Sequence, residues 1–146
     1  MKKGFTLVEL LIVMVVVTIL ATLAVPKYKI AMERGRGLEG LHNAQAISDA
    51  LNAFYIQDGN VYHAARHTLA LNASGATNGK YFDCTIAANT EEVTCERNNS
   101  SYPYKIVFSN SEGATTGKSC VENSGKYCRA LGATLPGNSG EWSFPQ

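Results

Sequence analysis

Charged residues are scarce in this chain, and their signs nearly cancel. Asp, Glu, Lys and Arg together make up 17% of its 146 residues, and the formal net charge is +1. Net charge therefore does not indicate nucleic-acid binding. The chain is also too short for an elaborate enzyme, because a single domain typically contains about 100 to 150 residues.

Metal-binding and catalytic patterns are missing as well. The four cysteines all lie beyond residue 80 and include no C-x-x-C pair, which disfavours a zinc site. His63 and His67 have the i, i+4 spacing of two metal ligands, but no H-E-x-x-H motif and no third ligand accompany them. We interpret them as solvated histidines in a loop. Since no active-site motif is recognisable, we predict no catalytic residue, no metal and no cofactor.

The chain does have a long apolar run at its N-terminus. Between Phe5 and Val25 the only charged residue is Glu9, and a helix of this length spans roughly 30 Å, enough to cross a bilayer. A carboxylate within hydrocarbon costs on the order of 2.5 to 3.5 kcal/mol, so we predict that Glu9 is functional and has a partner. Lys2 and Lys3 predict that the N-terminus stays in the cytoplasm.

This opening resembles that of a known family. The sequence K-G-F-T-L-V-E-L-L-I-V is similar to the class III signal of type IV pilins and of the related pseudopilins of type II secretion. The resemblance implies that residues 1–4 are a leader, cut after Gly4 by a prepilin peptidase, and that Phe5 is then N-methylated. It also implies a single-pass inner-membrane protein, assembled into an extracellular filament of its own copies by a membrane platform and a cytoplasmic ATPase.

Cleavage after Gly4 would give Glu9 a partner. Phe5 would gain an α-amino group that is mostly cationic at neutral pH, with a pKa near 8. Glu9 lies one helical turn away and can also face the amine of a neighbouring subunit. Because an unpaired buried charge is costly, such pairing acts mainly to set the register between helices. The resemblance implies the same role, and the family also has a proline at the place of Pro26, so we assign both residues to filament assembly.

Residues 26–57 are predicted to continue the helix as an amphipathic half. Pro26 and the glycines that follow disfavour helix, so we expect a soft or partly melted segment between Pro26 and Gly40. Beyond it, apolar residues recur at three- and four-residue steps, which predicts a helix to about Gln57 with one face packed on a sheet. These apolar positions are Leu38, Leu41, Ala44, Ile47, Leu51, Phe54 and Tyr55.

Residues 58–146 are predicted to form a globular head, which makes the fold class α+β. We expect a surface loop over residues 60–80 and then an antiparallel sheet of three to five strands. The stronger strand signals are at Tyr81–Ile86, Glu92–Glu96 and Tyr104–Ser109, and the weaker ones at Tyr127–Leu131 and Glu141–Phe144. Turn residues cluster at Asn98–Ser101, Ser109–Gly117 and Pro136–Gly140.

The four cysteines of the head predict two disulfides, because an exported region lies in an oxidising compartment. We prefer Cys84 with Cys95, which lie in adjacent predicted strands, and Cys120 with Cys128. All three connectivities remain possible from the sequence. A small loop closed near the C-terminus resembles the disulfide-bounded loop of many type IV pilins.

Two alternatives remain. Major pseudopilins have a C-terminal calcium site built from acidic residues, whereas this chain has no aspartate after Asp83, which favours a pilin. The same opening also resembles a secretory signal peptide cleaved after Thr22-Leu23-Ala24, which would release a soluble binding module that starts near Val25. Glu9 and the length of the apolar run argue against this second alternative.

Overall fold

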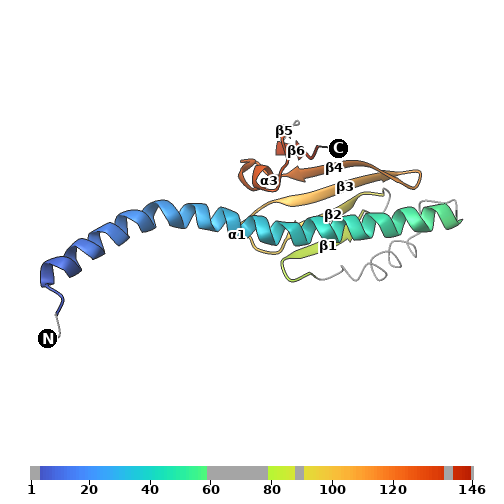
Figure 1. Ribbon diagram of the computed structural model, residues 1–146. Coiled ribbons are helices and arrows are strands. Elements are labelled where there is room, and N and C mark those ends of the chain that lie inside the picture. The colour runs from blue at the N-terminus through green and yellow to red at the C-terminus, as the bar shows by residue number, and fades with distance from the viewer. Residues whose placement is uncertain (1–3, 59–78, 88–90, 137–139, 146) are drawn as a thin grey trace. The chain divides into compact units, whose positions relative to one another are not determined.

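The computed structural model describes residues 4–58, 79–87, 91–136 and 140–145 (Figure 1). The chain divides into two compact units, Met1–Met32 and Glu33–Gln146, which are described separately below. The helix α1, Leu7–Asp58, contributes to both units. Its first half makes up the described part of the first unit, and its second half belongs to the second unit together with the strands.

Helix α1 is continuous over 52 residues and contains Pro26. The expectation of a partly melted segment between Pro26 and Gly40 is therefore wrong. The physical reason lies partly in the glycines, since a Cβ at Gly37 would collide with the Leu131 side chain and one at Gly40 would come within 2.8 Å of Phe82. Glycine there lets the helix approach the sheet closely, and this packing outweighs the cost of about 1 kcal/mol per glycine in a helix.

The second half of α1 lies across one face of the sheet (Figure 1). Of the apolar positions predicted to be buried, Leu38 is an exception, because its side chain is 54% exposed. Glycines 37 and 40 take the place on the sheet-facing side that Leu38 was expected to occupy. Most of the buried positions recur at steps of three and four, as an amphipathic helix requires, and Ser48 is buried beside them: Glu33, Gly37, Gly40, Ala44, Ile47 and Leu51.

The sheet has six antiparallel strands in the order β1-β2-β3-β4-β6-β5. This confirms the α+β class, although the prediction was three to five strands. Strands β1 to β3 correspond to the three stronger predicted strands, and β6 to the last of the weaker ones. Their bounds are β1 Phe82–Ile86, β2 Val93–Arg97, β3 Lys105–Ser111, β4 Ala114–Val121, β5 Leu135–Pro136 and β6 Glu141–Ser143.

Strand β4 occupies a segment that was partly predicted as a turn. Within Ser109–Gly117, β3 and β4 are joined at Glu112 and Gly113, whose φ angles are 52° and 77°. Two consecutive residues with positive φ are typical of a two-residue hairpin turn that matches the twist of the sheet. The strand was not predicted because the polar residues of β4, mainly Thr, Gly, Lys and Ser, give little hydrophobic alternation.

Residues predicted as a weak strand, Tyr127–Leu131, instead form most of a short helix, α3, Lys126–Ala130. The carboxylate of Glu122 accepts hydrogen bonds from the backbone N–H groups of Tyr127 (2.7 Å) and Cys128 (3.0 Å). An anion at this end satisfies donors that a helix start leaves unpaired. This contact within the head decided the local structure against the strand propensity of the segment.

Both disulfides lie within the head and join cysteines close in sequence. Cys84 and Cys95 are directly opposite each other in β1 and β2, and Cys120 at the end of β4 is joined to Cys128 in α3. This is the pairing that the sequence analysis preferred. All four cysteines are buried in the core, which contains the helix residues Ala44, Ile47 and Leu51 and the strand residues Phe82, Val93, Ile106 and Phe108.

Candidate processing and assembly site

The first half of α1 is apolar and fully exposed in the single chain. Every residue from Gly4 to Lys29 is exposed, and an 18-residue window of the helix has a mean hydropathy of 2.8. By length and composition, α1 is the one helix among the described residues that can cross a membrane. Apolar surface of this extent marks a membrane or protein contact rather than a water-facing surface.

The predicted cleavage point lies just before this helix. Gly4 and Phe5 are exposed and precede Leu7, the first helical residue, and Phe5 is 86% exposed. The peptide bond between them is therefore outside the hydrogen-bonded helix, where it is open to a peptidase. Pro26, the other residue assigned from the resemblance, lies within α1.

Glu9 forms a reciprocal pair with Thr6 at the start of α1. One carboxylate oxygen, Oε2, accepts hydrogen bonds from the backbone N–H and the hydroxyl of Thr6, both at 2.9 Å. In return, the backbone N–H of Glu9 donates to the Thr6 hydroxyl at 3.3 Å. This T-x-x-E arrangement is a capping box, which satisfies backbone donors at a helix start. Among the described residues, the second oxygen, Oε1, accepts no hydrogen bond.

The capping role of Thr6 was missed in the sequence analysis, although the signal is local. The sequence Thr6-Leu7-Val8-Glu9 stands directly before an apolar helical run, which is the recognised pattern of a capping box. Glu9 was interpreted only through its charge. Its geometry shows that the same carboxylate also fixes the first turn of the helix.

A buried ionic cluster holds the second half of α1 to the sheet. Glu33, the first buried residue of the helix, accepts hydrogen bonds from Arg97 Nε at 2.5 Å and from the Tyr104 hydroxyl at 3.1 Å. Arg36 lies 3.4 Å from the other oxygen of Glu33. The side chains of Glu33 and Arg97 are 1% and 3% exposed. No sequence pattern could have linked these residues, because Arg97 and Tyr104 lie far along the chain from Glu33.

The cluster changes the acidity of its members. Burial raises the pKa of Tyr104 well above its ordinary value, and the charge of Glu33 and its hydrogen bond with the Tyr104 hydroxyl raise it further. Burial by itself lowers the pKa of Arg97, but the hydrogen bond to Glu33 and the charge of Glu33 raise it overall. Both effects follow from placing these groups in a low-dielectric environment beside a carboxylate.

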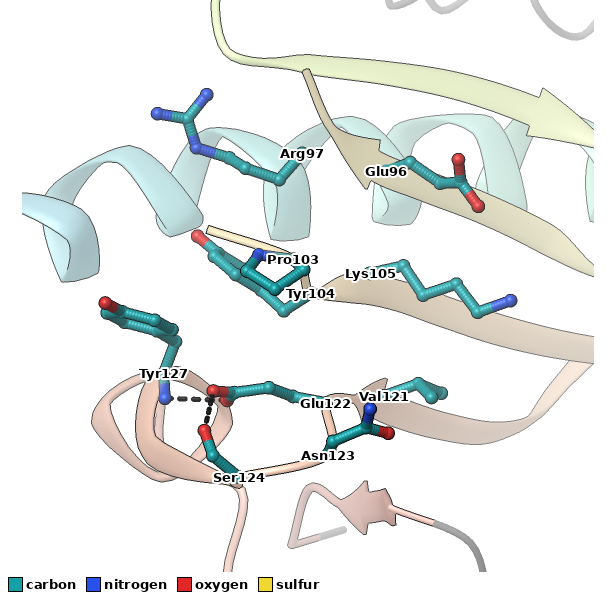
Figure 2. Close-up of a pocket in the computed structure, with 10 residues that line it drawn as sticks. All are labelled: Glu96, Arg97, Pro103, Tyr104, Lys105, Val121, Glu122, Asn123, Ser124 and Tyr127. Atoms are coloured by element: carbon teal, nitrogen blue, oxygen red, sulfur yellow. Dashed lines mark hydrogen bonds between the residues drawn. The ribbon is translucent and has the colours of Figure 1, made fainter. Parts of the chain in front are cut away.

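The head also has a pocket of about 480 Å³ beside this cluster (Figure 2). Its walls include Tyr104 and Tyr127, and Figure 2 shows the Glu122 carboxylate turned toward Ser124 and the backbone nitrogen of Tyr127. That carboxylate accepts hydrogen bonds from the Ser124 hydroxyl and from the backbone N–H groups of Tyr127 and Cys128, so it serves to hold the start of α3. The pocket contains no serine, cysteine or threonine beside a histidine, the arrangement that would activate a nucleophile.

The part of the chain that the structure describes contains no group of three His, Cys, Asp or Glu residues able to hold a metal ion. His63 and His67, considered above as possible ligands, lie outside the described residues.

Sequence comparison shows which known proteins this chain resembles. Residues 1–25 match the family model described as the prokaryotic N-terminal methylation motif. The chain is 34% identical over 94 residues to the fimbrial protein EcpC of Eikenella corrodens, covering 63% of this chain and 60% of the relative. It is 30% identical over 106 residues to the type IV major pilin protein PilE of Neisseria gonorrhoeae, covering 73% and 62%. It is also 33% identical over 103 residues to the type IV major fimbrial protein FimA of Dichelobacter nodosus, covering 68% and 63%.

The chain thus spans about three fifths of the length of these relatives. No solved structure matches it. The fold and the motif define an α+β protein whose apolar N-terminal helix carries a methylation signal. The chain is similar to type IV pilin and fimbrial proteins, and its first 25 residues match the methylation motif.

Proposed function

We propose that this chain is a structural subunit of a type IV pilus, held in the inner membrane before assembly and located in an extracellular filament afterwards. The observation that supports this most is the exposed apolar half of α1, with a single carboxylate at its start and the methylation motif over it. We also infer that the chain is not an enzyme. Its relatives are pilin and fimbrial proteins, in agreement with this function.

Processing is the first step of the proposed mechanism. A prepilin peptidase cuts between Gly4 and Phe5 on the cytoplasmic side, and Phe5 is N-methylated. This cut leaves the capping box intact, because Thr6 keeps its backbone N–H and its hydroxyl. The first turn of α1 therefore stays fixed while a new cationic amine appears beside it.

Glu9 then aligns one subunit with the next. Its Oε2 is engaged by Thr6 within the chain, which leaves Oε1 for the Phe5 amine of a neighbouring subunit. In the apolar interior of a helical bundle an unpaired carboxylate is costly, so the axial position that pairs it is strongly preferred. Glu9 accordingly acts as a register device.

Assembly transfers the apolar half of α1 from lipid into a bundle of its own kind. The backbone hydrogen bonds of a helix are internal, so neither environment leaves them unpaired, and apolar burial is preserved. Contacts that repeat without closing generate a filament. The further partners, an assembly platform and its ATPase, are proposed from the resemblance alone.

The second candidate function is a pseudopilin of type II secretion, which would share the same motif and membrane segment. The pilin and fimbrial names of the relatives favour the pilus subunit over the pseudopilin. A soluble module released near Val25 remains the alternative from a different class. Mass spectrometry of the mature N-terminus decides that case, since methylated Phe5 supports a pilin and Val25 a secreted module.

The assembly role of Glu9 is tested with two substitutions that separate charge from capping. Glu9→Gln keeps an oxygen that can accept from Thr6, because Gln also serves in a capping box, whereas Glu9→Ala removes both functions. We expect both variants to stay in the membrane and to form few or no filaments by electron microscopy. Thr18→Ala is the control, because its hydroxyl bonds only locally to Met14 O at 2.8 Å. Normal filaments from Glu9→Gln would contradict the proposed role of the charge.

A further inference from the structure

Three cationic side chains, one from α1 and two from the head, lie over one aromatic ring. The guanidinium carbons of Arg36 and Arg97 and the ammonium nitrogen of Lys80 each lie 5.2 Å from the centroid of the Tyr81 ring. Because all three lie at the same distance from one point, any two of these cationic groups are separated by no more than twice that distance. We name these four residues the Tyr81 cluster. Cations over an aromatic face are attracted to the ring, but cations this close also repel one another.

The carboxylates in contact with the Tyr81 cluster do not balance its charge. Glu33 pairs with both Arg97 and Arg36, and Glu39 accepts the backbone N–H of Tyr81 at 2.8 Å. Within the described residues, two carboxylates thus face three cations, and Lys80 has no ion pair. Counted over these residues, the cluster has excess positive charge.

Arg36 has hydrogen-bonding capacity that the head does not use. Its Nε is buried and has no acceptor among the described residues, and its one ion pair, with Glu33, is as long as 3.4 Å. The side chain is 31% exposed, so the guanidinium is reached from solvent. A guanidinium of this kind is suited to an anion with several oxygens, because its planar fork can bind two of them at once.

We propose that the Tyr81 cluster binds the phosphate group of an anionic lipid headgroup while the subunit is held in the membrane. This inference rests on the membrane-held state of the proposed function. Arg36 follows Val25, the end of the apolar run, by only eleven residues of the sequence, so the chain itself limits how far the cluster can lie from the lipid that holds this run. The excess positive charge of the cluster is complementary to an anionic headgroup.

The cluster would give the head a preferred contact with an anionic bilayer. Lys80 and Arg36 supply the accessible cations, whereas Arg97 is buried and mainly holds the ring and Glu33 in place. Release of a phosphate from these two side chains would accompany transfer of the subunit from lipid to filament. The bound group is defined here by its phosphate, which a lipid headgroup or a free phosphate ion could supply.

The test measures how accessible Lys80 is in the full chain. The wild-type protein is reconstituted into vesicles of phosphatidylcholine alone, or of phosphatidylcholine mixed with phosphatidylglycerol, and the rate of acetylation of each lysine is followed by mass spectrometry. We expect the anionic lipid to slow acetylation of Lys80 about fivefold, the effect of one cation at an anionic surface. Lys126 is the internal control, because it is exposed and lies 5.4 Å from the Tyr127 ring without belonging to the cluster.

Further arms identify the source of the phosphate and the role of Arg36. Inorganic phosphate added to vesicles of phosphatidylcholine alone should not protect Lys80; protection there would assign the cluster to free phosphate and overturn the lipid assignment. Arg36→Gln should reduce the protection of Lys80, and Arg36→Lys should largely restore it. Equal acetylation rates of Lys80 in the two kinds of vesicle, or equal slowing of Lys126, would overturn the proposal.

Failure of this inference is distinguishable from failure of the proposed function. A chain that remains in the vesicles and assembles into filaments, but whose Lys80 is unprotected, contradicts only the lipid contact. A mature chain that lacks residues 5–24 and does not enter vesicles contradicts the pilus subunit itself.

Discussion

Replacing Arg97 by Met should strongly destabilise the head, because it leaves Glu33 as a buried carboxylate without its main partner. Arg97 donates to Glu33 at 2.5 Å, and both side chains are almost fully buried. Removing one member of a buried ion pair costs about 3 to 5 kcal/mol. Two other donors remain near Glu33, Tyr104 at 3.1 Å and Arg36 at 3.4 Å. We therefore expect the lower part of that range, about 3 kcal/mol.

The complementary variant removes both charges. Glu33→Met combined with Arg97→Met and Tyr104→Phe leaves no buried charge alone and no buried hydroxyl without an acceptor, so the loss in stability should be much smaller than in Arg97→Met. Well-packed apolar residues often replace a buried ion pair at little or no cost. Tyr104→Phe is included because the Tyr104 hydroxyl would otherwise lose its acceptor, at about 1 to 3 kcal/mol.

The free energy of unfolding of the head is measured by urea titration of the full chain in mild detergent. Trp142 is the only tryptophan in the chain and packs against Gly125, so its fluorescence reports on the folded head. Arg34→Met is the matched control, because Arg34 is an exposed residue of the same helix, and surface substitutions usually change stability by less than about 0.5 kcal/mol. If Arg97→Met costs no more than Arg34→Met, the reasoning about the buried cluster is refuted.

Three further predictions concern the same head. Gly40→Ala should cost about 1 to 3 kcal/mol, because the added Cβ would lie 2.8 Å from Phe82 and 2.9 Å from Ile106. Gly35→Ala meets open space and should instead stabilise the helix by up to about 1 kcal/mol. Equal effects of the two substitutions in urea titration would contradict this reasoning. Replacing Cys120 and Cys128 together by Ala should cost about 2 to 3 kcal/mol from the entropy of the small loop, and an unchanged urea midpoint would exclude that contribution. Burial and Glu33 raise the pKa of Tyr104 in the folded chain, so the Tyr104 hydroxyl loses its proton first in the unfolded chain as pH rises. The free energy of unfolding should therefore fall above about pH 10, and it should fall less steeply in Tyr104→Phe.

The sequence predicted those features that depend on neighbours along the chain. Alternating aromatic and β-branched residues located β3, and the three- and four-residue steps from Ala44 to Leu51 located the helix face that packs on the sheet. The prepilin-type opening was recognisable for the same reason, since its residues are contiguous.

Features that depend on distant parts of the chain were not predictable in this way. Helix α3 starts where Glu122 accepts two backbone N–H groups, a contact that outweighs the strand preference of the segment. Continuous helix through Gly37 and Gly40 depends on the side chains of Leu131 and Phe82, which fill the space the glycines leave. The Glu33 cluster joins positions whose proximity only the fold creates.

Neither disulfide includes a residue of α1, since both lie between Cys84 and Cys128. Apart from the backbone itself, the sheet is therefore joined to the helix only by non-covalent contacts. Mechanical load applied through the N-terminal half would be borne at the helix–sheet contact by side-chain packing and by the Glu33 ion pair, while the cross-linked strands stay intact. Under tension, the helix should detach from the sheet before any covalent bond in the head is strained.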